Sequence, residues 1–223
     1  MKTGKNIRKA KDILIDLLFP EKCLGCGKRG QLICPLCLSK IEPSKEQAGP
    51  NIYSVFSYKD SIARRAIWYL KYRHNYRLAD RLGKIMFHLT KQKLPLFYKV
   101  NPLEKILVIP IPLSRKKKWV RGYNQSEHLA KAFCKEDKYN LFSFEKRLLF
   151  KKRETKPQAE IKNRRKRLEN IKGAFFIKDK EKIKGKTILL IDDVVTTGGT
   201  LKEASLVLKE AQAKKVCAFT LAH

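Results

Sequence analysis

Acidic residues are scarce in this sequence of 223 residues. Only 21 Asp and Glu stand against 51 Lys and Arg, which gives a formal net charge of +30 at pH 7. A surface that basic attracts polyanions over long range, so the composition predicts an anionic partner. Most of the basic residues are lysine, a skew that A/T-rich coding also produces. A solvated lysine surface without such a partner is therefore the alternative.

Long hydrophobic runs are also missing. No segment approaches the 18 or more apolar residues that a membrane span needs. A basic stretch at 1–11 precedes a short apolar run at 13–19, but Asp16 interrupts the run and no small-residue cleavage site follows. We therefore expect an amphipathic helix at 11–19 that ends at Pro20, and a cytoplasmic protein with no transmembrane segment.

The sequence shows no internal repeat and no low-complexity tract, and its hydrophobic content of 43% argues against wholesale disorder. Helical patterns alternate with short apolar patterns that are typical of strands. This alternation predicts an α/β fold with a parallel sheet covered by helices on both faces. The expected strands are 51–57, 106–110, 148–150, 174–177, 188–191 and 216–221, and the expected helices are 61–72, 77–90, 123–135 and 201–212. We expect an N-terminal module at 1–45, a linker at 42–50 and an α/β domain at 51–223.

Four cysteines lie close together near the N-terminus, in two Cys-x2-Cys pairs: Cys23, Cys26, Cys34 and Cys37. Four thiolates with two-residue gaps fit a tetrahedral zinc ion, and a cytosolic setting disfavours disulfides. No position is left for water, so we expect a structural zinc ion. An iron–sulfur cluster and four reduced cysteines without a metal are the alternatives. Cys134 and Cys217 lie in apolar surroundings, where we expect buried core residues.

The most specific pattern is an apolar strand that runs directly into two adjacent carboxylates. Asp192 and Asp193 follow the strand at 188–191, a loop of Thr and Gly follows them, and a helix begins near Leu201. A helix N-terminus at the carboxyl end of a parallel strand offers free N–H groups to a phosphate, while carboxylates beside it accept hydrogen bonds from sugar hydroxyls. The pattern thus predicts a sugar-phosphate site. It lacks the lysine of a Walker A loop, and a plain Gly-rich turn with surface acids is the alternative.

This pattern resembles the signature with which type I phosphoribosyltransferases bind phosphoribosyl diphosphate (PRPP). The resemblance implies that Asp192 and Asp193 hold the ribose 2′- and 3′-hydroxyls. It also implies that the 5′-phosphate lies in the loop made by Val194, Val195, Thr196, Thr197, Gly198, Gly199 and Thr200.

Nearly the whole chain resembles the ComF (ComFC/GntX-like) family. The resemblance rests on Phe19 and Pro20, the two cysteine pairs, the acid pair with its loop, and segments at 70–73, 108–115, 121–125, 153–158 and 165–170. Val120 departs from the pattern, because family members often carry an acid there. The resemblance implies a competence protein of natural transformation that acts on incoming single-stranded DNA, with PRPP and Mg²⁺ in its site. A helicase or an inner-membrane channel are candidate partners.

Two further groups of residues are assigned through the same resemblance and through charge. The diphosphate and Mg²⁺ are expected at Pro112, Leu113, Ser114, Arg115 and Lys116, with Arg115 and Lys116 as charge partners and a solvated basic loop as the alternative. Residues 146–167 hold eleven Lys and Arg against two acids, which fits a hood over PRPP or a DNA track. The residues expected in this hood or track are Arg121, Tyr123, Asn124, Gln125, Arg153, Gln158, Arg164, Arg165 and Arg167. Tyr123, Asn124 and Gln125 equally fit a cap of the following helix.

Aromatic and basic residues alternate around Trp68, Tyr69, Tyr72 and Tyr76. At helical spacing such aromatics belong more often to a core, and platforms for stacked bases are the alternative. Two other functions stay open beside DNA handling. One is a salvage phosphoribosyltransferase acting on a free base, and the other is a PRPP-sensing adaptor without turnover.

Overall fold

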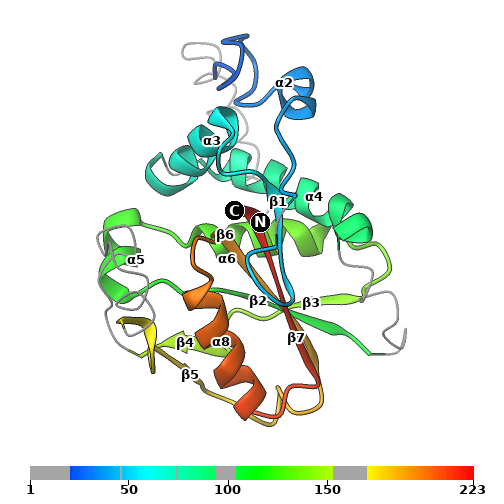
Figure 1. Cartoon of the computed structure of the whole chain (residues 1–223), viewed down its shortest axis with the longest axis vertical. Coiled ribbons are helices and arrows are strands. Elements are labelled where there is room, and N and C mark those ends of the chain that lie inside the picture. The colour runs from blue at the N-terminus through cyan, green and yellow to red at the C-terminus, as the bar shows by residue number, and fades with distance from the viewer. Residues whose placement is uncertain (1–20, 46, 74, 94–103, 153–169) are drawn as a thin grey trace, which may run out of the picture.

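The computed structural model describes residues 21–45, 47–73, 75–93, 104–152 and 170–223. These residues form a five-stranded parallel sheet with helices on both faces, and a cysteine-containing segment packs on one helical layer (Figure 1). The expected α/β class with a covered parallel sheet is confirmed. The helix expected at 11–19 lies outside the described residues.

The sheet has the strand order β1-β7-β6-β2-β3, and every neighbouring pair is parallel. The strands are β1 (Ile52–Phe56), β7 (Lys215–Ala222), β6 (Thr187–Val194), β2 (Ile106–Pro110) and β3 (Phe142–Phe144). The central strands β6 and β7 are almost continuously apolar because both of their faces are covered. Two expected strands, β4 (Leu149–Lys151) and β5 (Phe175–Ile177), pair with each other in a separate antiparallel ribbon.

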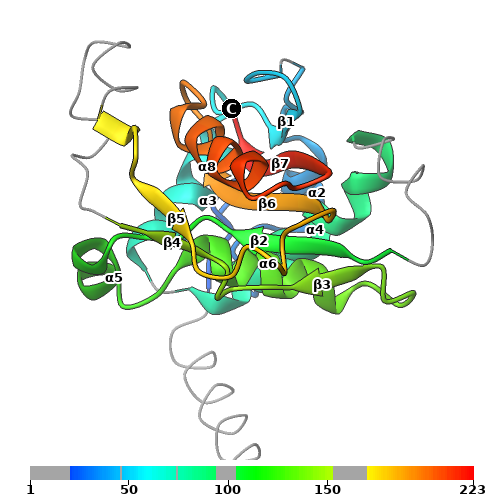
Figure 2. The ribbon, with the colours of Figure 1, turned by 90° about the horizontal axis from the view of Figure 1, so that it is seen from below.

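Alternate strand residues face two hydrophobic clusters, one on each side of the sheet. On one side Leu189 and Phe219 pack with Phe133 of a helical layer, and on the other Leu190 packs with Leu208. The first layer consists of α3 (Ser61–Tyr72), α4 (Tyr76–Lys93) and α6 (Gln125–Lys135), and the second of α8 (Gly199–Glu210) with the β4–β5 ribbon (Figure 2).

A short helix that the sequence patterns missed precedes α6. The helix α5 (Arg115–Arg121) is capped by the Ser114 hydroxyl and ends at Gly122, whose φ of 67° is left-handed. Asn124 is extended, and its side chain caps α6 by accepting a hydrogen bond from the Ser126 N–H. The helix expected to begin at Tyr123 therefore begins at Gln125.

The cysteine segment is joined to α3 and α4 through the same hydrophobic cluster. Leu24 and Ile33 are buried with residues of both helices, and the Asn75 side chain donates to Glu21 over 2.8 Å. The segment includes the helix α2 (Pro35–Ser39). The described part of the expected linker runs beside β1, where the Ser44 N–H donates to the Val55 carbonyl over 3.0 Å. No helix within the described ranges is both long and apolar enough to cross a bilayer.

Candidate functional site

A cavity of about 700 Å³ lies at the carboxyl ends of β2 and β6. Asp192 and Asp193 line it together with residues 194–200, which follow them. The loop after β2 adds Pro112, Leu113 and Ser114. The structure thus brings the predicted acid pair, the predicted phosphate loop and three of the five predicted diphosphate residues into one space, as expected at the carboxyl edge of a parallel sheet.

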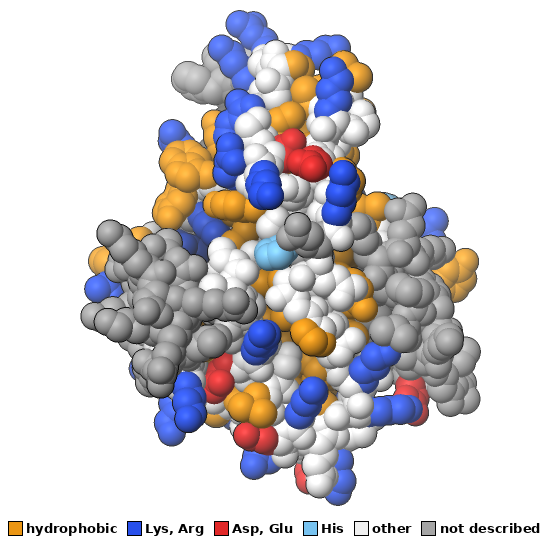
Figure 3. Space-filling model, viewed as in Figure 1, with side chains coloured by type: hydrophobic (Ala, Val, Ile, Leu, Met, Phe, Trp, Pro, Cys, Tyr) orange, Lys and Arg blue, Asp and Glu red, His pale blue; other side chains and the backbone are white. Residues whose placement is uncertain are grey.

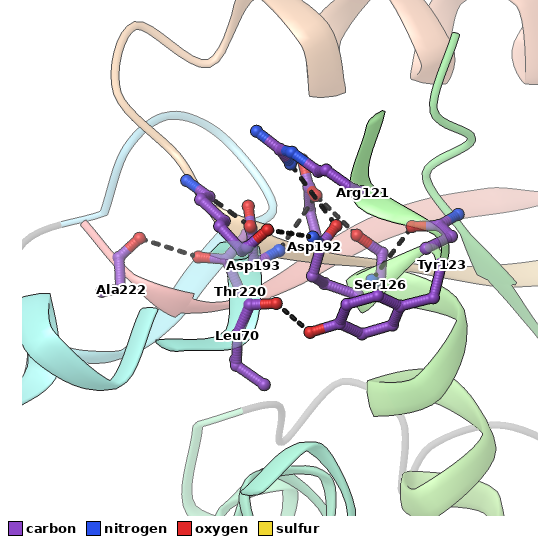
Figure 4. Close-up of polar contacts among 11 residues, drawn as sticks. Leu70, Arg121, Tyr123, Ser126, Asp192, Asp193, Thr220 and Ala222 are labelled. Atoms are coloured by element: carbon purple, nitrogen blue, oxygen red, sulfur yellow. Dashed lines mark hydrogen bonds and ion pairs between the residues drawn. The ribbon is translucent and has the colours of Figure 1, made fainter. Parts of the chain in front are cut away.

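The two carboxylates are held in place by different partners. The Ser126 hydroxyl at the start of α6 donates to Asp192 Oδ1 over 2.8 Å, and the Asp193 N–H donates to the same oxygen over 2.9 Å (Figure 4). Burial raises the pKa of Asp192 to about 7, and the nearby Asp193 carboxylate adds to the rise. Near neutral pH the pair therefore carries less than two full negative charges, which lowers the cost of placing two carboxylates side by side.

The helix N-terminus beside the acids is open toward the cavity. Gly198 is the N-cap of α8, with a φ of 73°, and its conformation is one that a residue with a Cβ rarely adopts. In the described structure no side chain caps this helix. The first N–H groups of α8 are therefore available to an anion, and the helix dipole favours one there.

Four cationic side chains line the cavity. Three of them, Lys71, Lys117 and Arg121, are here called its cationic wall, and the fourth is Lys151 of β4. The Lys71 Nζ lies 3.4 Å from Asp193 Oδ2. Burial lowers the pKa of Lys71, but the carboxylates of Asp193 and Asp192 outweigh burial and raise it overall. Lys117 and Arg121 are four residues apart on α5 and so share one face of that helix.

Arg115 and Lys116, the expected charge partners, are not among the residues that line the cavity. They are the first two residues of α5, and both side chains are exposed. The sequence predicts one loop at 112–116, whereas in the structure α5 begins at Arg115 and places Lys117 and Arg121 at the cavity. The signal that points to the latter pair is their i, i+4 spacing.

Tyr123, Asn124 and Gln125 are buried, and Tyr123 and Gln125 fasten the end of α3 to the α5–α6 junction. The Tyr123 hydroxyl donates to the Leu70 carbonyl (Figure 4), and the Gln125 amide donates to the Lys71 carbonyl over 3.4 Å. Burial raises the pKa of Tyr123 to about 12, which keeps this hydroxyl a donor. These residues hold Lys71 at the acid pair.

Lys71 and Lys117 are cavity residues to which the sequence patterns gave no role in the site. The segment of Lys71, 70–73, only contributed to the family resemblance, and nothing local in the sequence links Lys71 to Asp193. The remaining hood or DNA residues lie outside the described residues: Arg153, Gln158, Arg164, Arg165 and Arg167.

The core interpretation is wrong for three of the four clustered aromatic residues. Trp68, Tyr72 and Tyr76 are 47%, 54% and 51% exposed, and only Tyr69 packs against the core. They are exposed because they lie on the outer side of the α3–α4 layer, whose inner side is supplied by smaller apolar residues. Arg121, at the cavity, lies 5.7 Å from the centre of the Tyr72 ring.

The four clustered cysteines have the geometry of a tetrahedral metal site. Their sulfur atoms all lie within 4.8 Å of one another, and Cys26 Sγ is 3.8 Å from Cys34 Sγ. Zn–S bonds of about 2.3 Å in a tetrahedron place sulfurs about 3.8 Å apart. A Cβ at Gly25 would lie 2.5 Å from Cys37 Sγ, so the turn requires glycine. This donor set can bind a metal ion such as zinc.

Backbone N–H groups favour the thiolate form of Cys23, whereas burial and the neighbouring cysteines raise the pKa of Cys37 to about 12. Burial alone would raise the pKa of the Cys23 thiol, but N–H groups, that of Cys34 first, lower it to about 6. No cysteine of the described chain forms a disulfide. As expected, Cys217 is buried, while Cys134 is partly buried against the core.

Known proteins match parts of this chain. The model of the phosphoribosyl transferase domain family matches residues 144–223, which include β6, the acid pair and the loop that follows. Among solved structures, the allosteric regulatory enzyme of purine biosynthesis is similar, with a TM-score of 0.39 and 16% identity, covering 64% of this chain and 26% of that chain. Residues 144–223 are thus similar to phosphoribosyl transferase domains, and the cysteine cluster lies N-terminal to them.

Two curated relatives narrow the resemblance. Competence protein F of Haemophilus influenzae is 34% identical over 118 residues, which are 52% of this chain and 49% of the relative. Competence protein ComFC of Streptococcus pneumoniae is 41% identical over 113 residues, which are 51% of this chain and 46% of the relative. The chain spans about half the length of these relatives. The resemblance to ComF proteins is confirmed.

Proposed function

We propose that this protein serves natural transformation by handling incoming single-stranded DNA in the cytoplasm, and that its cavity binds PRPP with Mg²⁺. The names of the competence relatives support the role, and the net charge of +30 supports an anionic polymer as partner. One observation supports PRPP as the ligand: a carboxylate pair, an uncapped helix N-terminus and a cationic wall line the same cavity.

The sugar and its phosphate fit the acidic side of the cavity. The free oxygens of Asp192 and Asp193 would accept hydrogen bonds from the ribose hydroxyls. The 5′-phosphate would lie on the N–H groups at the start of α8, with the hydroxyls of Thr196 and Thr197 as further donors. A cavity of about 700 Å³ falls within the usual size range of small-ligand sites.

The diphosphate fits the cationic side. Lys71, Lys117 and Arg121 would neutralise it, and the guanidinium can bind two oxygens at once. Mg²⁺ usually keeps several waters and is bound mostly by substrate phosphates, with one or two carboxylates. Asp192 already accepts two hydrogen bonds, and Asp193 already pairs with Lys71. The diphosphate and water would therefore supply most of the Mg²⁺ ligands.

The same arrangement suits phosphoribosyl transfer. A nucleophile would form a bond to the anomeric carbon while the bond from that carbon to the diphosphate oxygen breaks, and the diphosphate leaves with the electron pair. The acid pair would stabilise the positive charge that develops on the ribose, and the three cations would stabilise the leaving group. Binding without turnover uses the same contacts, so the adaptor function shares this site.

Calorimetry with and without Mg²⁺ tests the ligand. We expect the wild type to bind PRPP only with Mg²⁺, and we expect Asp192→Asn with Asp193→Asn to lose at least tenfold in affinity, since amides cannot supply the same charge. The matched control is Glu181→Gln with Glu210→Gln, two exposed acids outside the cavity lining, which should bind as the wild type does. A folded wild type that does not bind PRPP would refute the proposal.

A second pair of variants separates the cationic wall from the exposed start of α5. Lys117→Ala with Arg121→Ala should weaken PRPP binding at least tenfold, whereas Arg115→Ala with Lys116→Ala removes the same charge and should change it less than twofold. A larger loss of affinity in the Arg115 and Lys116 variant would show that these two residues bind the diphosphate.

A further inference from the structure

A groove between α4 and α6, separate from the PRPP cavity, is lined mainly by cationic side chains. It has a volume of about 690 Å³. Five cations face it with a single carboxylate: Arg77, Arg81, Lys84, Lys131, Lys135 and Asp80. The carboxylate of Asp80 is already bound to two of these cations, with Lys84 at 3.5 Å and Lys135 at 3.7 Å. The groove therefore presents a net positive surface.

The two helices run in the same direction and approach each other closely. Gly83 makes the approach possible, because a Cβ there would lie 2.6 Å from the Ala132 Cβ and from the Leu129 carbonyl. Tyr76 contacts His128 at one end of the pair of helices, and Lys84 contacts Glu136 at the other. The groove is thus built by helix packing and not by a surface loop.

The cations form two parallel rows. Arg77, Arg81 and Lys84 are spaced by four and three residues on α4, so they share one face over about 10 Å. Lys131 and Lys135 are one turn apart on α6 and face the first row. Two facing rows of charges along a channel fit an extended polyanion better than a single phosphate.

An exposed aromatic ring stands at the entrance of the groove. The Tyr76 ring is half exposed and packs on His128, with ring centres 4.7 Å apart. Burial and the cations around it, Lys131 first, lower the pKa of His128 and outweigh the opposing effect of Glu127, so the neutral imidazole predominates at pH 7. The neutral His128 ring packs on one side of the Tyr76 ring, and the exposed side of the Tyr76 ring can stack on a base.

The same end of the groove adjoins the PRPP cavity. Tyr76 contacts Tyr123, with ring centres 5.2 Å apart, and the Tyr123 hydroxyl is bonded to the Leu70 carbonyl. The next residue, Lys71, lies at the acid pair. A polymer in the groove would therefore end beside Tyr72, whose exposed ring lies at the cavity.

We propose that the α4–α6 groove binds the backbone of a single-stranded nucleic acid and that Tyr76 stacks on one of its bases at the end nearest the PRPP cavity. The inference rests on the proposed function, because it assigns the DNA of that proposal to a surface. A charged groove with an aromatic platform holds single strands without reading sequence. A duplex hides its bases from Tyr76, and an acidic peptide has no base to stack.

Fluorescence anisotropy with an oligo-dT of about 16 nucleotides tests the groove. Arg77→Glu with Lys131→Glu reverses one charge in each row, and we expect affinity at about 0.15 M salt to fall at least tenfold. Each phosphate contact contributes about 0.7 to the slope of log affinity against log salt, so the slope should become shallower by about 1.4. The control, Lys184→Glu with Lys209→Glu, makes the same net charge change at exposed positions outside the groove, and its affinity should stay within twofold of the wild type.

Tyr76→Leu tests stacking separately from charge. It keeps an apolar side chain against Tyr123, so we expect affinity for oligo-dT to fall about tenfold with an unchanged salt slope. Competition by oligo-dT but not by polyglutamate or inorganic polyphosphate of equal charge would support the inference. Equal competition by all three, or equal loss in the groove variant and its control, would overturn it.

The outcome for PRPP is read independently. The groove variants should bind PRPP with Mg²⁺ as the wild type does, since none of their substituted residues lines the cavity. If the wild type binds DNA and the groove variants bind it equally well, the groove assignment fails and DNA handling stands. If the wild type binds no oligo-dT, the groove assignment and the DNA-handling function both fail. Calorimetry still decides whether the cavity binds PRPP.

Discussion

Asp192 is an ionisable group whose environment in the fold differs sharply from water. Its pKa rises from 3.8 to about 7, first because it is buried and then because Asp193 lies beside it. Between these two values the folded protein binds more protons at this site than the unfolded chain does. The free energy of unfolding therefore decreases as pH rises from about 4 to about 7, and the contribution is constant above that.

Asp192→Asn should remove this decrease. The amide keeps an oxygen that can accept from Ser126 but carries no charge, so we expect the variant to be more stable than the wild type near pH 8, by about 4 kcal/mol. Urea unfolding from pH 4 to 8 measures the difference. Asp179→Asn, an exposed carboxylate outside the cavity, is the control and should follow the wild-type profile. Parallel profiles for wild type and Asp192→Asn would contradict the prediction.

The acids were predictable from sequence, but their partner was not. Asp192 and Asp193 end an apolar strand and precede a Gly-rich loop, so a short stretch of sequence contains strand, acids, loop and helix. Lys71 reaches them only because Tyr123 and Gln125 fasten the end of α3 to the α5–α6 junction. Such long-range contacts leave no local pattern.

At the scale of elements, the buried helices and strands are the ones that the sequence predicts. Strands β6 and β7 are buried on both faces and read as apolar runs. The edge strand β3 has only three residues, all partly buried, and α5 has no buried residue at all, so neither gives a sustained apolar pattern. The cavity depends on α5 for Lys117 and Arg121, which is why the cationic wall escaped the sequence patterns.

The cysteine segment and the cavity are linked through α3. Residues of the segment share one hydrophobic cluster with Leu70, the neighbour of Lys71. A metal ion in the cluster would be the shared counter-ion of four thiolates, and its loss would loosen the packing under α3. Structural metal sites contribute folding free energy directly, so loss of the metal ion should also weaken ligand binding in the cavity.

We expect Cys26→Ser to lose the metal ion, to lower the melting temperature by about 10 °C and to weaken PRPP binding at least tenfold. Metal analysis, calorimetry and thermal unfolding measure the three effects. Cys134→Ser, which changes a cysteine outside the cluster, is the control and should keep the ion and the affinity. Intact PRPP affinity in a metal-free, folded Cys26→Ser protein would show that α3 is held without the cluster.

At the scale of the whole molecule, the excess of positive charge should oppose folding. Lys and Arg side chains are spread over the face in Figure 3, with few acids between them. A net charge far from zero destabilises a compact state through self-repulsion, and salt screens that repulsion over about 10 Å at 0.1 M. The exposed ion pairs act in the opposite sense. Lys214–Glu104 at 2.9 Å and Lys146–Glu127 at 3.0 Å are examples, and salt weakens them.

Net repulsion should prevail, because exposed ion pairs contribute only about 0–1 kcal/mol each. We expect the melting temperature to rise by on the order of 5 °C as NaCl is raised from about 0.02 to about 0.5 M. Lys184→Glu with Lys209→Glu removes four units of net charge and should show a smaller rise, which ties the effect to charge and not to chloride bound at one site. A melting temperature that falls with salt would mean that paired charges outweigh the unpaired ones. The basic surface would then stabilise the fold by itself, and the need for a polyanion to offset its charge would disappear.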